Sequence, residues 1–288
     1  MRERCEFRLI TSTRRPNHMK EPTVRELFDL SGKIALVTGG ARNLGYDMAL
    51  ALAESGANVG ITSRTLDSAK ASAKRITEQT GKKAVGFICD VRDETSVTLL
   101  VDAVLLEFGK IDILVNNAGN VVSSPDTAQI EDRPFEQWRD TLACNLDGVF
   151  LCSKHVVARA MKPAGSGVII NIASAAGLVG KDRRIYQGTN MGGATVDYHA
   201  AKGGVIAMTR DMAVYLARYG IRVNSISPGG FWRGHSDTFT RQYSDLVPMR
   251  RMGVDGKEMK GVVVFMAAEA SSYVTGANLA VDGGMTAW

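Results

Sequence analysis

Two side chains in the second half of the chain have the types and the spacing needed for acid–base chemistry. Tyr198 and Lys202 stand four positions apart, which on a helix places both side chains on one face, one turn apart. A phenol with a pKa of about 10 is a poor acid–base catalyst at neutral pH. A neighbouring ammonium favours the phenolate and so lowers that pKa. This pair is common in proteins, so it predicts proton transfer only when other chemical groups accompany it.

A glycine-rich segment follows a short apolar run in the first half of the chain. Residues 34–37 read IALV, and the segment from Thr38 to Gly45 reads TGGARNLG before a helical pattern begins. Glycines let the backbone turn tightly and approach a pyrophosphate at the N-terminus of a helix. Because the loop sits between a strand pattern and a helix pattern, the sequence predicts a dinucleotide cofactor here.

This loop resembles the TGxxxGxG fingerprint of the short-chain dehydrogenase/reductase family. The resemblance continues in NNAG at 116–119, Asn145, NIAS at 171–174, and VDGG at 281–284, and it covers roughly residues 30–288. Within the family the chain is most similar to gluconate 5-dehydrogenase-like members. One departure is Asn43, which stands where the fingerprint has its middle glycine. Asparagine tolerates a positive φ better than most residues, so we expect the turn to survive.

The resemblance implies roles for four residues. Tyr198 would be the general acid in reduction and the base in oxidation, and Lys202 would lower its pKa and hold the nicotinamide ribose. Ser174 would hydrogen-bond the substrate oxygen, and Asn145 would anchor a water that leads protons from Lys202 to solvent. The implied cofactor contacts are Gly39, Arg42, Asn43, Leu44, Gly45, Ser63, Arg64, Asp90, Val91, Asn117, Ala118, Gly119, Tyr198, Lys202, Pro228, Gly229 and Phe231. No metal is expected.

The end of the second expected strand bears on the choice of nicotinamide cofactor. It carries Ser63 and Arg64, where NAD-specific relatives carry an acidic residue for the ribose diol. Ser and Arg can bind a 2′-phosphate through charge-assisted hydrogen bonds, whereas a carboxylate would repel it. Arg42 in the glycine loop supports the same choice, Asp67 weakens it, and both arginines are also compatible with a solvated surface. We therefore expect NADP(H) rather than NAD(H).

Short apolar runs alternate with amphipathic segments along most of the chain. The expected strands are 34–37, 59–62, 84–89, 111–115, 168–172, 222–226 and 278–281, and the expected helices are 44–55, 68–80, 95–108, 138–161, 198–219 and 258–267. Continuous apolar strands between such helices predict an α/β fold with a doubly wound parallel sheet, the Rossmann fold, in a single domain. The carboxyl ends of these strands would then position the chemical groups named above.

Composition and charge exclude several other classes of protein. The 288 residues are 45% hydrophobic and 23% charged, which is ordinary for a soluble globular protein, and no apolar run approaches the roughly 20 residues of a membrane span. Much of the net charge of +5 lies in the first 20 residues, so a basic surface for nucleic acid is not expected. The scattered cysteines (Cys5, Cys89, Cys144 and Cys152) suggest free thiols in a reducing, cytoplasmic setting. Residues 1–29 are expected to form a flexible N-terminal extension. Alternatively, translation of the native protein begins at Met19.

Two segments near the expected entrance of the substrate site distinguish this chain from the common family pattern. The 24 positions between Ser174 and Tyr198 (198 − 174) are about twice the spacing common in the family. The extra residues belong to a substrate loop at 177–197, and residues 231–250 stand where the family has a mobile lid. Candidate substrate contacts are Lys181, Arg183 and Arg184 for a carboxylate or phosphate, Tyr186, Gln187 and Asn190 for hydroxyls, and Trp232, Arg233 and His235 in the lid. A solvated or subunit-contact loop is an equal alternative.

The predicted function is that of an NADP(H)-dependent oxidoreductase that interconverts a secondary alcohol and a ketone on a small polar substrate, a sugar acid or polyol. A 3-oxoacyl-carrier-protein reductase-like enzyme is the alternative, and a non-catalytic dinucleotide-binding scaffold is a third reading. The joint presence of Asn145, Ser174, Tyr198 and Lys202 argues against a scaffold, which has no use for a tuned phenol. The resemblance also implies a homodimer or homotetramer, with neither nucleic acid nor membrane as a partner.

Overall fold

A parallel sheet of seven strands forms the middle layer of the molecule. The structure, a computed structural model, describes residues 21–120 and 129–288. The strands are β1 (Ile34–Val37), β2 (Asn58–Ser63), β3 (Ala84–Ile88), β4 (Ile113–Asn116), β5 (Gly167–Ile172), β6 (Ile221–Pro228) and β7 (Asn278–Val281). Their order in the sheet is β3-β2-β1-β4-β5-β6-β7, so the chain runs outward from β1 and then returns to β4. The predicted doubly wound sheet is confirmed, with strand ends within two residues of those expected.

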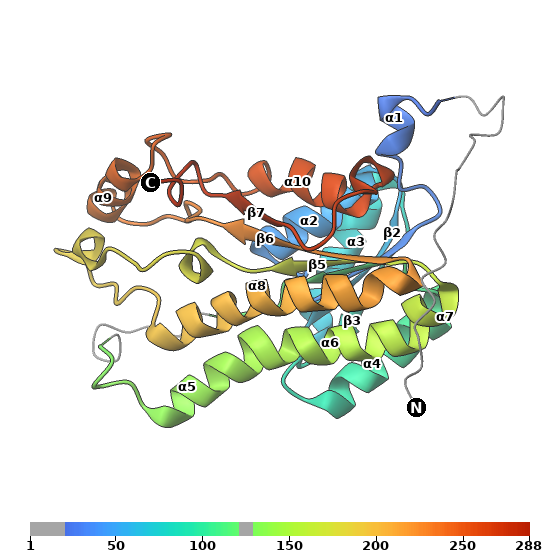
Figure 1. Ribbon diagram of the computed structural model, residues 1–288, viewed down its shortest axis with the longest axis horizontal. Coiled ribbons are helices and arrows are strands. Elements are labelled where there is room, and N and C mark those ends of the chain that lie inside the picture. Colours follow the sequence, from blue (N-terminus) through green and yellow to red (C-terminus); the bar gives the residue numbers. More distant parts are fainter. Residues whose placement is uncertain (1–20, 121–128) are drawn as a thin grey trace, which may run out of the picture.

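Helices cover both faces of this sheet. They are α1 (Val24–Leu27), α2 (Asn43–Glu54), α3 (Leu66–Thr80), α4 (Glu94–Phe108), α5 (Phe135–Leu142), α6 (Gly148–Val156), α7 (Lys162–Ala164), α8 (Val196–Leu216), α9 (Asp237–Leu246) and α10 (Glu258–Ala267). In Figure 1, α2, α3 and α10 lie on one side of the sheet, and α4, α5, α6 and α8 lie on the other. Each face has its own apolar core. Strands buried on both faces explain the continuous apolar runs in the sequence.

The helix expected at 138–161 is longer and less regular than its sequence pattern indicates. Helices α5, α6 and α7 follow one another without a break, joined by two π-helical segments, η2 (Ala143–Asp147) and η3 (Val157–Met161). Asn145 lies in η2, and its side-chain amide donates to the carbonyl of Thr141 at 3.0 Å. An α-helix would pair that carbonyl with the backbone amide of residue 145. Widened turns of this kind occur often at functional sites.

The described part of the expected N-terminal extension contains a short helix. In α1 the side chain of Thr23 accepts from the backbone of Glu26, and the Glu26 carboxylate accepts in return from the backbone of Thr23. Leu30 follows and is buried in the core. The first 20 residues, with Cys5 and both candidate start methionines, lie outside the described residues.

A buried ion pair ties the start of α8 to the segment that leads into α5. The Arg133 guanidinium donates to Asp197 Oδ2 from Nε at 3.0 Å and from Nη2 at 2.6 Å. The side chains of Arg133 and Asp197 are only 3% and 0% exposed. Arg133 also donates to the hydroxyl of Thr141, whose carbonyl holds the Asn145 amide. Because Asp197 directly precedes Tyr198, the pair joins the two helical segments that carry Asn145 and Tyr198.

Removal of one partner should leave the other charge buried and uncompensated. We expect Asp197→Ala to lower the free energy of unfolding by about 3–5 kcal/mol, the usual penalty for breaking a buried pair. The double variant Arg133→Met, Asp197→Leu should be more stable than Asp197→Ala, since it buries no lone charge. Urea unfolding measures both. An Asp197→Ala variant as stable as the parent chain would mean that this pair does not hold α5 and α8 together.

Candidate active site

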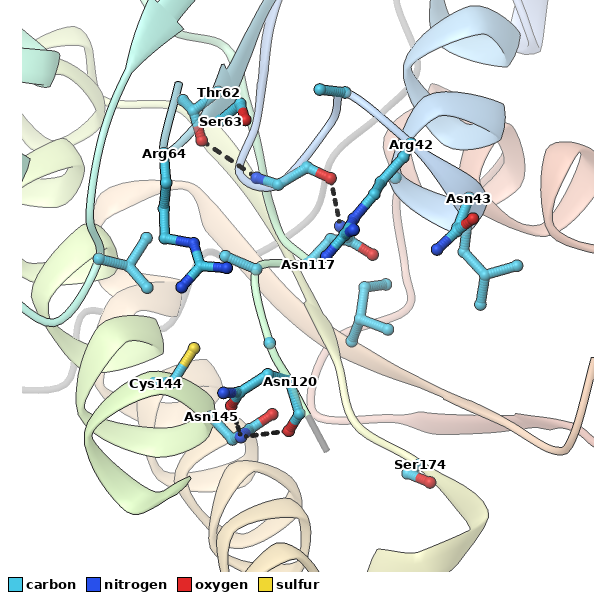
Figure 2. Close-up of a pocket in the computed structure, with 18 of the residues that line it drawn as sticks. Arg42, Asn43, Thr62, Ser63, Arg64, Asn117, Asn120, Cys144, Asn145 and Ser174 are labelled. Carbon is cyan, nitrogen blue, oxygen red and sulfur yellow. Dashed lines mark hydrogen bonds between the residues drawn. The ribbon is translucent and has the colours of Figure 1, made fainter. Parts of the chain in front are cut away.

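One cavity gathers the residues expected to contact the cofactor. It has a volume of about 710 Å³, and every predicted cofactor contact and all four predicted catalytic residues line it. The cavity lies at the carboxyl ends of the strands around β1 and β4, where the strand order reverses. This switch point is where open α/β sheets bind their ligands. Figure 2 shows part of the cavity wall, with Arg42 and Arg64 on one side and Asn145 and Ser174 on another.

The glycine loop has the backbone geometry that a close approach to a phosphate requires. Asn43 adopts a φ of 50°, so asparagine does accept the left-handed conformation at the position of the missing glycine. A Cβ at Gly45 would lie 2.3 Å from the carbonyl oxygen of Gly39 and 2.4 Å from Nδ2 of Asn117, so only glycine fits there. Helix α2 begins at Asn43 without a side-chain cap. Its first amides are therefore available to an anion.

Two threonines that the sequence patterns did not single out hold this loop against β2 and β4. The hydroxyl of Thr38 accepts from the backbone amides of Asn117 and Ala118, both at 3.0 Å. The hydroxyl of Thr62 accepts from the amide of Gly39 at 3.0 Å, a bond that Figure 2 also shows. Thr38 stands first in the fingerprint and so offered a signal, whereas Thr62 is an ordinary strand residue in the sequence. Thr38 thus joins the glycine loop to the wall made by 116–119, and Thr62 joins the same loop to β2.

Positive charge without a carboxylate partner lines one end of the cavity. Within the part of the chain that the structure describes, neither Arg42 nor Arg64 forms an ion pair, and Figure 2 shows both side chains extending from their loops. Asp90, in contrast, is bound by Arg92 at 2.6 Å, and this hydrogen bond holds the pKa of Asp90 below its ordinary value. The amides of α2, the two arginines and the cavity volume fit a dinucleotide that carries an additional phosphate.

The predicted acid–base groups meet at the inner end of this cavity. Burial raises the pKa of Tyr198, and a hydrogen bond with Ser174 lowers it in part. Lys202 lies with its Nζ 5.7 Å from the centre of the Tyr198 ring and donates to the carbonyl of Ile172 at 2.8 Å. Desolvation of the phenol is therefore the largest influence on the Tyr198 pKa in this structure, and it opposes the lowering expected from Lys202.

Lys202 and Asn145 are both deeply buried. Burial lowers the pKa of Lys202 from 10.5 to about 8, so the ammonium still carries its charge at neutral pH. Asn145 donates to the carbonyls of Asn120 and Thr141, but its Oδ1 has no partner among the described residues. A Cβ at Gly119 would lie 2.6 Å from that oxygen and 3.6 Å from Lys202 Nζ. An acceptor that lacks a partner so close to an ammonium fits the expected water in a proton path.

A second cavity, of about 460 Å³, opens on the other side of Ser174 and Tyr198. The expected substrate loop and lid form much of its wall. The loop contains a 3-10 turn, η5 (Arg183–Tyr186), and the lid contains α9. They pack together through a small apolar core of Ile185, Phe239, Tyr243, Val247 and Met252. The substrate cavity is therefore bounded by a folded unit of its own, which the sequence patterns did not predict.

Of the three cations that were candidates to contact a substrate anion, one lies in the wall of the substrate cavity. Neither Arg183 nor Arg184 lines the substrate cavity, whereas Lys181 does. The η5 turn buries Ile185 and thereby directs Arg184 outward, where it pairs with Asp182 at 2.6 Å and remains 81% exposed.

The other candidate substrate contacts divide in a similar way. Tyr186, Asn190, Arg233 and His235 line the cavity, while Gln187 and Trp232 do not.

Other reactive groups contribute little to the site. In the described ranges, no group of three or more His, Cys, Asp or Glu residues is placed to hold a metal ion, and no helix there is long and apolar enough to cross a membrane. Cys89, Cys144 and Cys152 are free thiols, and burial raises the pKa of each, that of Cys89 to about 11. Cys144 lines the larger cavity but is not a thiolate at neutral pH.

The buried charge of Lys202 should make stability depend on pH. Between pH 8 and 10.5 the unfolded chain binds more protons at this lysine than the folded chain does, so its contribution to the unfolding free energy rises with pH. Lys202→Met removes this dependence. The stability of Lys202→Met minus that of the parent chain should therefore fall by up to about 3 kcal/mol across that interval. Urea unfolding at several pH values measures it, and a constant difference would show that Lys202 is not desolvated.

Comparisons with known proteins agree with this geometry. The family model described as enoyl-(acyl carrier protein) reductase matches residues 39–286. The trans-4-hydroxycyclohexanecarboxylate dehydrogenase of Sinomonas cyclohexanicum is 39% identical over 88% of this chain and 93% of its own length. A sorbose reductase of Candida albicans is 35% identical over 91% of this chain and 90% of its own.

A solved structure shows the same likeness in three dimensions. The gluconate 5-dehydrogenase of Burkholderia cenocepacia, in complex with NADP and tartrate, has a TM-score of 0.82 and 33% identity, and the match covers 92% of this chain and all of that one. Sequence, fold and site geometry thus agree, and the chain belongs to the short-chain dehydrogenase/reductase family of oxidoreductases that act on CH–OH groups.

Proposed function

We propose that the protein is an NADP(H)-dependent oxidoreductase that interconverts a secondary alcohol and a ketone on a small polar substrate, a sugar acid or a polyol. The observation that carries this proposal is the meeting of the two cavities at Ser174 and Tyr198, which line both. A cofactor in the larger cavity and a substrate in the smaller one would share this boundary. When both reactants are bound side by side, hydride transfer takes place within one complex and requires no additional collision between them.

The chain's own residues can supply every proton step of this reaction. Ser174 and Tyr198 would hold the substrate oxygen, and Tyr198 would give its proton to that oxygen in reduction and take it back in oxidation. Lys202, charged and desolvated, would stabilise the phenolate left behind, and Asn145 Oδ1 would hold the water that restores the proton. When bound, the nicotinamide cofactor supplies or accepts the hydride. The glycine loop, α2 and the walls of the cavity would bind it.

Three features support NADP(H) over NAD(H). Arg42 and Arg64 line the cavity without an ion pair in the described ranges. Ser63 lies beside them at the end of β2, where its hydroxyl can donate to a phosphate. Asp90, the one carboxylate among the described residues of the cavity wall, is neutralised by Arg92. A 2′-phosphate would meet two cations there, and Asp67, which weakened this choice in the sequence, does not line the cavity.

The substrate class rests on the cavity and on the relatives. A volume of about 460 Å³ suits a compact molecule, and the relatives include a sorbose reductase and a gluconate 5-dehydrogenase. Met191, Met252 and Met285 in the wall would also accept an acyl chain, which keeps a 3-oxoacyl-thioester reductase as the second candidate. A panel of keto acids, ketoses and acyl-thioester mimics with NADPH distinguishes the two.

We also propose a cytoplasmic homodimer or homotetramer, without nucleic acid or membrane as a partner. Large apolar side chains are exposed on three helices of one face: Leu106 on α4, Phe150 on α6 and Val214 on α8, at 91%, 52% and 82%. A second copy of the chain packed over α6 and α8 would cover such groups.

Removal of the phenol should abolish the proton step and leave cofactor binding in place. We expect Tyr198→Phe to lower kcat by at least about a hundredfold, the usual scale of general acid–base catalysis. NADPH affinity, measured by fluorescence titration, should change little because the variant loses one hydroxyl while the other residues of the cofactor cavity remain. A variant with near-normal turnover would refute the assignment of Tyr198 as the acid.

Reversal of the charge at the end of β2 should change cofactor preference. The double variant Ser63→Asp, Arg64→Ala should lower kcat/KM for NADPH and raise it for NADH, since a phosphate partner is replaced by a repelling carboxylate. Lys74→Ala, on the exposed side of α3, serves as the control and should leave the ratio unchanged. A parent enzyme that already prefers NADH would overturn the choice of NADP(H).

A further inference from the structure

Lys181 brings an unpaired ammonium into the wall of the substrate cavity. The side chain is half-buried and lines the cavity together with Ser174 and Tyr198. Its Nζ lies 4.8 Å from the centre of the Tyr186 ring. Among the described residues it forms no ion pair, although Asp182 is its neighbour in the chain, because that carboxylate is engaged by Arg184. Partial burial has therefore removed water from the Lys181 ammonium, and no carboxylate of the described residues takes the place of that water.

The other ionisable groups of the cavity leave this charge uncompensated. No Asp or Glu is present among the described residues that line the cavity. Arg233 is paired with Asp255, with hydrogen bonds of 2.7 and 3.0 Å, and burial lowers the pKa of His235, so that imidazole is neutral at pH 7. Burial and the nearby Arg183 lower the pKa of Lys181 to about 8, which still leaves it charged at pH 7.

The position of this ammonium is fixed by packing. Tyr186 stacks on Phe239 of α9 with ring centres 5.5 Å apart, and both belong to the apolar cluster that joins η5 to α9. Gly193 lies against the same ring, since a Cβ there would come within 2.5 Å of it. Tyr186 is therefore clamped from two sides and gives Lys181 a fixed surface. Arg184, only three positions away, is directed to solvent by the same turn.

We propose that Lys181 is the carboxylate-binding residue of the substrate cavity, and that the enzyme accordingly selects a monoanionic keto or hydroxy acid over the neutral polyol or ketone of the same shape. This inference rests on the proposed function and narrows its substrate class from sugar acid or polyol to the acid. A carboxylate in the cavity would pair with a lysine that is already desolvated and held in place, so little ordering would be needed on binding. The ligand's carboxylate would replace the missing partner of Lys181 through a charge-assisted hydrogen bond.

Two matched pairs of ketones test the proposal. In the pair 5-keto-D-gluconate and L-sorbose, the ketone and hydroxyl pattern is the same, and a carboxylate in the first is a hydroxymethyl group in the second. In the pair 4-oxocyclohexanecarboxylate and cyclohexanone, the acid differs from the neutral ketone by the carboxylate alone. For each ligand we would measure kcat and KM with NADPH, and also its Kd for the enzyme–NADP⁺ complex by calorimetry. The variants are Lys181→Met, Lys181→Arg and the solvent-facing control Arg184→Ala.

We expect at least one acid to bind roughly tenfold or more tightly than its neutral counterpart, the order of one charge-assisted contact. Lys181→Met should abolish this preference by raising KM and Kd for the acid much more than for the neutral ketone. Lys181→Arg and Arg184→Ala should retain it. No preference in either pair, or a preference that survives in Lys181→Met, would overturn the proposal. Loss of turnover with every ketone would instead count against the proposed function, while the Kd values would still decide the role of Lys181.

Discussion

The active site is organised around an ammonium buried at the end of the sheet, for which the described residues provide no carboxylate partner. Lys202 is 4% exposed, and its Nζ donates to the carbonyl of Ile172, the last residue of β5. A charge in this position opposes folding, since desolvation favours the neutral amine. The surrounding elements hold it in one place: β5 supplies the acceptor and α8 the backbone. The π-helical turn at 143–147 adds the Asn145 oxygen, which has no hydrogen-bond partner among the described residues. The same features that oppose stability would make Lys202 useful to a phenolate beside it.

Parallel strands explain why groups from distant parts of the sequence meet here. The carboxyl ends of β1, β2, β4, β5 and β6 all face one edge, so each strand delivers a residue or loop to the same two cavities. The glycine loop after β1 and the wall after β4 are joined by Thr38. The buried ion pair between Arg133 and Asp197 ties the helical segment that carries Asn145 to the helix that carries Tyr198. Cofactor, proton path and substrate would thus be placed by one sheet rather than by separate domains.

The sequence was sufficient to predict the elements whose patterns are local. Continuous apolar runs between amphipathic segments predicted all seven strands and a doubly wound parallel sheet, and the fingerprint placed Gly39, Asn43 and Gly45 where the structure has them. The family resemblance also implied that Asn145, Ser174, Tyr198 and Lys202 share one site, and all four line the larger cavity. These features depend on backbone geometry and period, both of which are visible along the chain.

Features that depend on which way a side chain turns were not predictable in the same way. The three cations at 181–184 were candidate contacts for a substrate anion, with a solvated loop as an equal alternative. Burial of Ile185 in the η5 turn directs Arg184 outward, whereas Lys181 lines the cavity. The Arg133–Asp197 pair joins residues 64 positions apart and carries no local signal. In the π-helical turn at 143–147 the side chain of Asn145 bonds to the helix carbonyl of Thr141, which a helical pattern does not reveal.

The central claim is that the two cavities form one active site in which the nicotinamide of NADP(H) exchanges a hydride with a substrate carbonyl held at Tyr198. The most direct test is to reduce the ketones of both matched pairs with NADPH that carries deuterium at the transferable position, and to examine the alcohol products by mass spectrometry and NMR. The account predicts one deuterium on the new carbinol carbon, on one face only. Alcohol without deuterium at that carbon, or no alcohol from any of the ketones while NADPH binds, would contradict it.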